Sequence, residues 1–154
     1  MSVFEAVAES ANGRIVEVGI KRTEAMRGRL RMKAPDGADL VVDLPRGMSI
    51  KDGDIFGPSA QGTYYRTRIE QEPVLMVTMK KTGDGMIEDA LRLGYTLGNH
   101  HLEVLIDDGR AYIPAVIGAD KIGKIIGKAG IDVDTQVIHR VISPGTSGYF
   151  AGED

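Results

Sequence analysis

The hydrophobic pattern of this chain changes near residue 72, and that change constrains the fold more than any other feature of the sequence. Before it, short runs alternate polar and apolar residues with a period of two, which is typical of β-strands. No helical period of useful length occurs before residue 80. We therefore expect a small all-β domain over residues 1–72. Its main candidate strands are Ile15–Arg22, Arg27–Lys33, Ala38–Leu44 and Thr63–Ile69.

From residue 73 onward, strand patterns alternate with amphipathic helices. The first helix, Asp84–Leu97, is expected to place one apolar face on the sheet, made of Ile87, Ala90, Leu91, Gly94 and Leu97. The second repeats this spacing at Ile122, Ile125, Ile126 and Ala129. The four strands are expected at Val74–Lys80, Leu102–Ile106, Arg110–Val116 and Val133–Ile142.

The resulting order, β-α-β-β-α-β, predicts a ferredoxin-like domain over residues 73–143, with both helices on one face of an antiparallel sheet. The chain as a whole is then α+β. Residues 144–154 show no period, and we expect them to form a flexible tail.

Composition excludes several classes of protein. The 154 residues contain no Cys, which rules out disulfides, thiolate metal sites and thiol catalysis. They contain only three His. The formal net charge of −3 argues against a dedicated binder of nucleic acid or anionic membrane. Glu5 and Glu9 place charges where a signal peptide needs an unbroken apolar stretch. No apolar run approaches the roughly 20 residues that span a bilayer. We expect a cytoplasmic protein.

The segment Gly127-Lys128-Ala129-Gly130 resembles the GxxG loop with which KH domains clamp a nucleotide backbone. The nearby Lys121 and Lys124 favour this interpretation, whereas Asp132 and Asp134 oppose it. Short motifs of this kind have a high false-positive risk. An RNA-binding module remains the alternative hypothesis.

Arg27, Arg29 and Arg31 alternate along one predicted strand and therefore share a face. A solvated face explains this pattern, and so does a docking surface for an acidic partner protein.

His100 and His101 follow a helix that ends in Leu97-Gly98-Asn99. Adjacent histidines that enter a strand point in different directions, so they cannot both ligate one ion as a simple pair. Spacing alone favours a surface or capping role for each and leaves metal binding as a second reading.

Several short motifs nevertheless occur in a characteristic order. Leu44-Pro45-Arg46-Gly47 precedes Lys51-Asp52-Gly53-Asp54-Ile55, and Glu72-Pro73-Val74-Leu75 precedes Leu93-Gly94-Tyr95-Thr96-Leu97-Gly98-Asn99-His100-His101. Gly148-Tyr149 then follows Pro144. In this order, from about residue 20 to residue 150, the chain resembles the UreE family of urease accessory proteins, which are nickel metallochaperones.

The resemblance implies an amino-terminal β domain for partner docking, similar to a peptide-binding domain, and a carboxy-terminal ferredoxin-like metal-binding domain. It implies a homodimer with Ni²⁺ at the interface and His101 as the ligand from each subunit. His100 stands where the family usually has Arg and is a weaker candidate, as a supplementary donor. His139 is either a third ligand or a half-buried strand histidine.

By the same resemblance, the partners are urease and the other urease accessory proteins, with no membrane and no nucleic acid. Zn²⁺ or Cu²⁺ could occupy the same imidazole site. The expected activity is exchange of ligands around a metal, and we expect no enzymatic reaction, because the sequence has no nucleophile elbow, no complete P-loop and no catalytic Cys.

Overall fold

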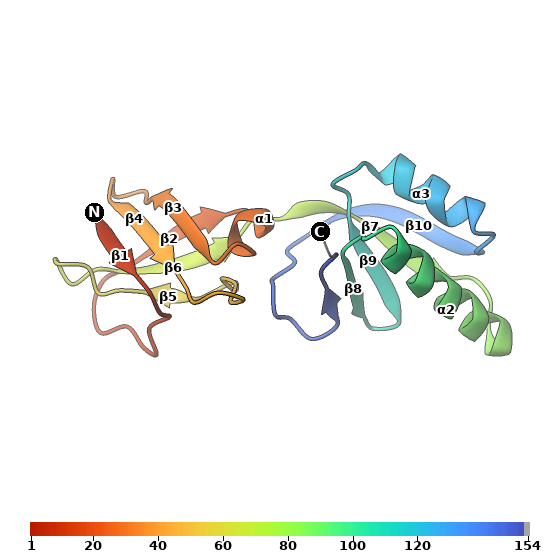
Figure 1. The fold of residues 1–154 in the computed structure, drawn as a ribbon, viewed down its shortest axis with the longest axis horizontal. Coiled ribbons are helices and arrows are strands. Elements are labelled where there is room, and N and C mark those ends of the chain that lie inside the picture. The colour runs from red at the N-terminus through yellow and green to blue at the C-terminus, as the bar shows by residue number, and fades with distance from the viewer. Residues whose placement is uncertain (153–154) are drawn as a thin grey trace. The chain divides into compact units, whose positions relative to one another are not determined.

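The computed structural model of the chain describes residues 1–152 and divides into two compact units (Figure 1). Unit 1 consists of Met1–Glu70 and a later segment, Val141–Thr146. Unit 2 consists of Gln71–Arg140 and the described residues from Ser147 onward. The predicted α+β class is confirmed, since strands dominate residues 1–152 and three helices accompany them there.

Unit 1 contains two three-stranded sheets. In the first, β4 (Asp39–Asp43) lies between β1 (Ser2–Phe4), which is parallel to it, and β3 (Arg29–Lys33), which is antiparallel. In the second, β6 (Tyr64–Ile69) lies between the parallel β2 (Ile15–Ile20) and the antiparallel β5 (Ile55–Phe56).

The period-two alternation of these strands produces a shared hydrophobic core. Burial alternates along β3, where Leu30 and Met32 point inward and the three basic residues point outward. Three aromatic side chains belong to this core, and the centroid of the Phe4 ring lies 6.4 Å from that of Phe56 and 6.4 Å from that of Tyr65.

A single helical turn, α1 (Arg22–Ala25), is present in the unit that we expected to be all-β. Its start is capped because the Lys21 backbone N–H donates to the Glu24 carboxylate at 3.0 Å. Four residues are too few to show a helical period, so sequence periodicity could not reveal this turn.

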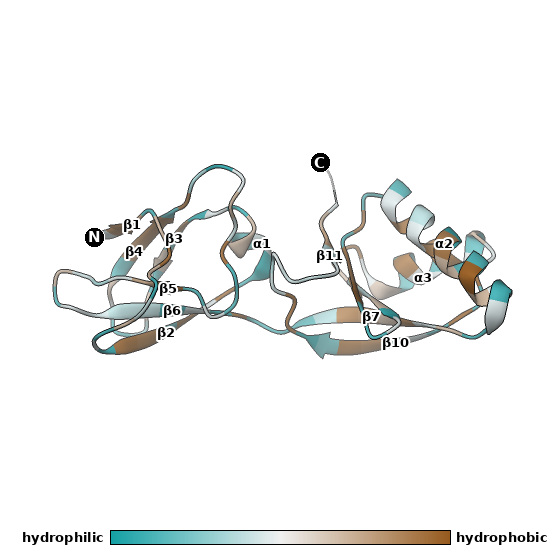
Figure 2. Cartoon of the chain, turned by 90° about the horizontal axis from the view of Figure 1, so that it is seen from below, coloured by the Kyte–Doolittle hydropathy of each residue, from teal (hydrophilic) through white to brown (hydrophobic). Residues whose placement is uncertain are grey.

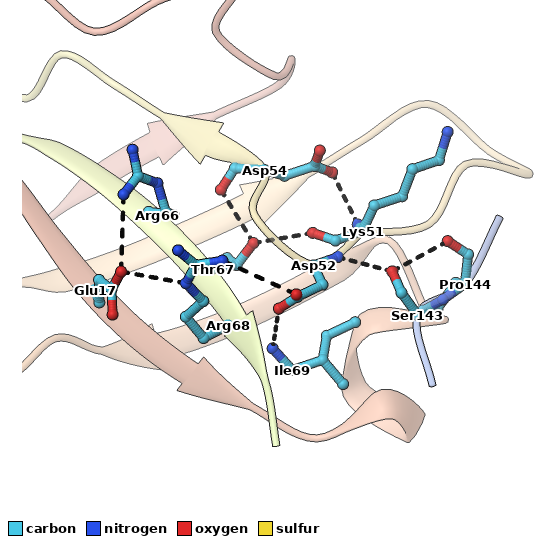
Figure 3. A network of polar contacts seen from close by, with 10 residues as sticks. All are labelled: Glu17, Lys51, Asp52, Asp54, Arg66, Thr67, Arg68, Ile69, Ser143 and Pro144. Carbon is cyan, nitrogen blue, oxygen red and sulfur yellow. Dashed lines mark hydrogen bonds and ion pairs between the residues drawn. The ribbon is translucent and has the colours of Figure 1, made fainter. Parts of the chain in front are cut away.

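The Lys51–Asp54 turn of unit 1 is held by a polar network (Figure 3). Its Asp52 carboxylate accepts a hydrogen bond from the Ile69 N–H at 2.8 Å, and the Asp52 N–H donates to the Ser143 hydroxyl at 2.8 Å. The buried Thr67 hydroxyl donates to the carbonyls of Lys51 and Asp54. This part of the recognised motif therefore has a structural role, because it ties one turn to β6 and to the late segment of the unit.

Unit 2 has one five-stranded sheet in the order β10-β7-β9-β8-β11, in which every neighbouring pair is antiparallel. Its elements are β7 (Glu72–Met79), α2 (Gly83–Asn99), β8 (Val104–Asp107), β9 (Arg110–Pro114), α3 (Ala119–Lys128), β10 (Val133–Arg140) and β11 (Tyr149–Phe150). Both helices lie on one face of the sheet (Figure 2). Leu93 and Leu97 of α2 and Ile122 and Ile126 of α3 share a core with Leu75, Val77, Ala111 and Ile113 of the sheet.

The face that α2 turns toward the sheet differs from the expected one. Leu93, Thr96 and Leu97 are buried, whereas Ile87 is 55% exposed and Leu91 is 71% exposed. The helix carries two apolar stripes, and a helical period alone does not show which stripe meets the sheet.

The expected flexible tail, residues 144–154, also differs. Tyr149–Phe150 forms β11, which pairs with β8 in the register Tyr149 to Leu105 and Phe150 to Val104. A strand of two residues has no period to read, and its pairing depends on a partner more than forty residues away. Residues 153 and 154 of that tail lie outside the described part of the chain.

The structure gives no support to the KH alternative. Gly127 lies inside α3, and Gly130 adopts a φ of 71° just after the helix end. The GxxG segment is therefore the end of a helix that leads into β10, and it forms no loop between two helices. Within residues 1–152, no helix has the length and hydropathy needed to cross a membrane.

Candidate metal site

His101 occupies the turn that ends α2, in a backbone conformation that glycine usually adopts. The His101 N–H donates to the Gly98 carbonyl at 3.0 Å, and the Leu102 N–H donates to the Leu97 carbonyl at 3.0 Å. These two bonds are those of a Schellman motif, in which the residue after the C-cap is left-handed. His101 is that residue, with a φ of 54°, and His100 is the C-cap. The helix thus ends two residues later than the sequence predicted.

This turn fixes the backbone of His101 while its side chain remains exposed. A left-handed conformation is unfavourable for a residue with a Cβ, and non-glycine residues in it concentrate at functional sites. The Schellman bonds and the packing of Leu102 against the core hold the conformation in place.

His100 is oriented by its own helix. Its Nδ1 lies 2.9 Å from the Thr96 carbonyl oxygen, and because a carbonyl only accepts, Nδ1 carries the hydrogen of this bond. The neutral imidazole then has its free lone pair on Nε2, which is the atom that could bind a metal ion. His100 is therefore a competent donor that points from the same turn as His101.

The last described residues of the chain pass directly beside this turn. A Cβ added to Gly152 would lie within 1.9 Å of the His101 carbonyl oxygen, so no side chain fits there. β11 is held in place because the Tyr149 hydroxyl donates to the Glu103 carboxylate at 2.7 Å. The sequence pattern reveals neither this strand nor the close approach of Gly152, two residues after it, to the His101 backbone.

His139 is not brought to His101 within one chain. It lies on β10, at one edge of the sheet, whereas His101 precedes β8, which is three strands away. With neighbouring strands about 4.8 Å apart, that separation is roughly 14 Å. Within residues 1–152, no three His, Cys, Asp or Glu side chains gather closely enough to hold a metal ion.

A stripe of exposed apolar side chains leads along α2 toward the histidine turn. It consists of Ile87, Leu91 and Tyr95, of which Leu91 is 71% and Tyr95 75% exposed. Gly94 and Gly98 lie beside it, and a Cβ on either would meet nothing within 4 Å. We call these five residues the α2 stripe. The spacing of these residues by three and four positions is visible in the sequence, but the helical pattern predicts Ile87, Leu91 and Gly94 on the buried face.

Comparison with known proteins identifies the family that this chain resembles. The family model described as UreE urease accessory protein, N-terminal domain, matches residues 3–61. A urease accessory protein UreE of Natronomonas pharaonis is 26% identical over 118 residues, which are 75% of this chain and 53% of that protein. The UreE proteins of Yersinia bercovieri and Yersinia rohdei are each 22% identical over 116 residues, which are 72% of this chain and 51% of each of those proteins.

The predicted resemblance to the UreE family is thus confirmed, with an amino-terminal domain of UreE type in unit 1. The chain spans about half the length of the curated relatives it matches. Those relatives are named as accessory proteins of an enzyme, which agrees with the expectation that the chain is not itself an enzyme.

Proposed function

We propose that this chain is a cytoplasmic nickel metallochaperone that binds Ni²⁺ between two copies of itself and delivers it for assembly of the urease active site. The observation that carries the proposal is the left-handed, exposed His101 at the end of α2, in a chain similar to urease accessory proteins. Ni²⁺ is the cargo, and the chemistry is exchange of ligands around it.

The imidazole donors of this turn suit Ni²⁺ in a protein without thiolates. One chain offers two adjacent histidines there, which is too few for a closed coordination sphere. A two-fold axis beside His101 would bring two equivalent imidazoles to one ion, and His100 Nε2 could add further donors. Such an open site would let a donor from an acceptor protein displace the imidazoles one at a time.

The α2 stripe supports dimerisation at this place. Full burial of a large apolar side chain such as Leu91 stabilises a complex by about 1.5–3 kcal/mol. In an isologous dimer the same stripe residue is buried in both subunits, so each position contributes two times. The two glycines let the backbones of two helices approach closely. Because the stripe runs toward His101, pairing of two α2 helices along it would favour bringing the two His101 side chains together.

Unit 2 serves as the metal-binding unit in this proposal, as a ferredoxin-like domain. Its element order, β-α-β-β-α-β, and its sheet order, β10-β7-β9-β8, support that assignment. Unit 1 would dock urease or another accessory protein. Its outward face on β3 presents Arg29 and Arg31, and the ion pair of Arg29 with Asp43 is long, at 3.8 Å, so this face suits an acidic surface.

Calorimetric titration of the metal-free chain with NiCl₂ tests the site. We expect one Ni²⁺ for two chains and loss of this binding in His101→Ala. The matched control is His139→Ala, which removes an exposed histidine elsewhere on unit 2 and should bind as the unchanged chain does. Equal loss in both variants, or binding that survives His101→Ala, contradicts the assignment of His101.

Sedimentation equilibrium tests the dimer. We expect a mass of twice 16.6 kDa for the unchanged chain, a monomer for Leu91→Glu, and no change for Glu88→Ala, which alters an exposed α2 residue outside the stripe. Delivery is measured as activation of metal-free urease at limiting Ni²⁺. A chain that binds Ni²⁺ but gives no activation would be a nickel buffer and not a urease chaperone.

A further inference from the structure

The outermost strand of unit 2, β10, has a long unpaired edge. β10 is eight residues long and pairs only with β7 among the strands of residues 1–152. Most of its residues are exposed. Proteins usually cover, shorten or twist such an edge, because its free N–H and C=O groups are a template for another strand.

The hydrogen-bond pattern shows which backbone groups of β10 face outward. The Pro73 carbonyl of β7 accepts from the Ala115 N–H at 3.0 Å, so Pro73 turns its backbone toward β9. In an antiparallel ladder, alternate residues turn to opposite sides, so the residues of β7 that turn toward β10 are Val74, Met76 and Thr78. Their partners on β10 are Ile138, Gln136 and Asp134. The N–H and C=O groups of Thr135 and Val137, between these partners, therefore point away from the sheet.

A groove lies between this edge and α3. It has a volume of about 430 Å³ and is lined by Gly123 and Lys124 of α3 and by Thr135 and Val137 of β10. Thr135 and Val137 are opposite Val77 and Leu75, whose side chains face the helices, so they form the floor of the groove. Val137 is 51% exposed, and a Cβ on Gly123 would meet nothing within 4 Å. The groove can therefore hold an apolar side chain.

The helix beside the groove, α3, carries more positive than negative charge. The lysines of α3, Lys121, Lys124 and Lys128, make no ion pair within residues 1–152. Two acidic residues, Asp132 and Asp134, follow the helix, and Lys80, which lies 3.6 Å from the first and 3.7 Å from the second, offsets one of their two negative charges. Asp120, at the start of α3, is the acidic residue in the lining. Together with Lys80, Asp132 and Asp134, four lysines stand against three carboxylates, and this net charge of +1 favours an acidic occupant.

We propose that β10 and α3 form a docking site for an extended acidic segment of a partner protein, which adds to the sheet as a sixth strand. The backbone groups of Thr135 and Val137 would bind the main chain of that segment. The space above Val137 and beside Gly123 would take one of its apolar side chains, and Lys124 would bind a carboxylate two residues away, on the same face of the added strand. This site lies apart from the histidine turn, on the opposite edge of the sheet.

The probe for this site is the blocked heptapeptide Val-Thr-Glu-Thr-Val-Thr-Glu, which places its Val and Glu side chains on one face of the added strand, and the matched control has Lys in place of each Glu. Binding to the ¹⁵N-labelled full chain is followed by amide chemical shifts and by hydrogen exchange. We expect the acidic peptide to bind at least ten times more tightly than the basic one. We also expect saturation to slow exchange of the Thr135 and Val137 amides at least tenfold.

Three variants test the contacts separately. Gly123→Leu fills the groove and suits a helix, Val137→Pro removes an outward N–H that the sheet does not use, and Lys124→Glu reverses the charge. Each should weaken peptide binding at least tenfold while circular dichroism stays unchanged. Nickel binding gives a second measure of the fold for any variant whose spectrum changes.

The proposal is wrong if the acidic peptide does not bind, if both peptides bind equally, or if Gly123→Leu and Lys124→Glu bind as the unchanged chain does. It is also wrong if the Thr135 and Val137 amides are already protected without peptide to a degree that rises with protein concentration. In that case a second copy of this chain covers the edge.

Discussion

Replacement of His101 by Gly should abolish metal binding and at the same time stabilise the protein. A residue with a Cβ in the left-handed conformation costs about 1–2 kcal/mol, and glycine relieves that cost. Glycine also adds freedom to the unfolded chain, which offsets about 0.5–1 kcal/mol of the gain. Because the His101 side chain is exposed and its hydrogen bonds are made by the backbone, little else is lost. The expected net gain is therefore about 0.5–1 kcal/mol.

The matched variant is His101→Ala, which also removes the imidazole but keeps a Cβ at a φ of 54°. Urea unfolding of both variants in the presence of a chelator, followed by circular dichroism, separates strain from metal binding. His101→Gly should be more stable than His101→Ala by about 1 kcal/mol, roughly a fivefold change in the folded-to-unfolded ratio. If His101→Gly proves the less stable of the two, the backbone at this turn is not strained and the argument from its conformation fails.

Three further predictions concern the rest of the fold. Asp52→Ala should lower the free energy of unfolding, measured by denaturant titration, by about 1–3 kcal/mol, because the Ile69 N–H loses its acceptor. The matched control Asp43→Ala removes an exposed ion pair and should change this free energy by less than about 0.5 kcal/mol. Burial, and then the hydrogen bond to Asp36, raises the pKa of Tyr65 above its usual 10.0, so the stability it contributes is complete below pH 10 and declines as pH rises through the folded pKa. The difference in the free energy of unfolding between the unchanged chain and Tyr65→Phe should show this decline above pH 10. A difference that does not change with pH would contradict it. Gly127→Ala should raise stability by about 0.5–1 kcal/mol in thermal unfolding, because position 127 is helical and open, and a loss of stability would mean that Gly127 is not in a regular helix.

The elements that sequence patterns predicted best are those whose burial follows from their own period. Leu30 and Met32 on β3 are buried, and Ile122 and Ile126 on α3 are buried, because alternation and helical spacing each select one face. The order of elements from β7 to β10 also follows from the sequence, since each of these strands and helices is long enough to show its period.

The features that the sequence did not reveal depend on partners far along the chain. β11 exists because β8 offers an edge and Glu103 accepts from Tyr149. Whether the Leu91 side chain faces the sheet or the solvent depends on which of the two apolar stripes of α2 packs against the sheet. At the candidate site, the sequence indicates His100 and His101 but not the left-handed turn at residue 101. The sequence pattern predicts that the helix stops at Gly98 and Asn99, whereas the turn forms at a histidine beyond them.

The late segment of unit 1 has a consequence for how the protein is made. Val141 packs against the core of unit 1, and Ser143 accepts the Asp52 N–H. A ribosome that has synthesised residues 1–70 has therefore not yet supplied every part of the unit that those residues begin. The amino-terminal unit can become complete only after nearly the whole of the second unit has been translated, so its last contacts form after the next domain has been synthesised.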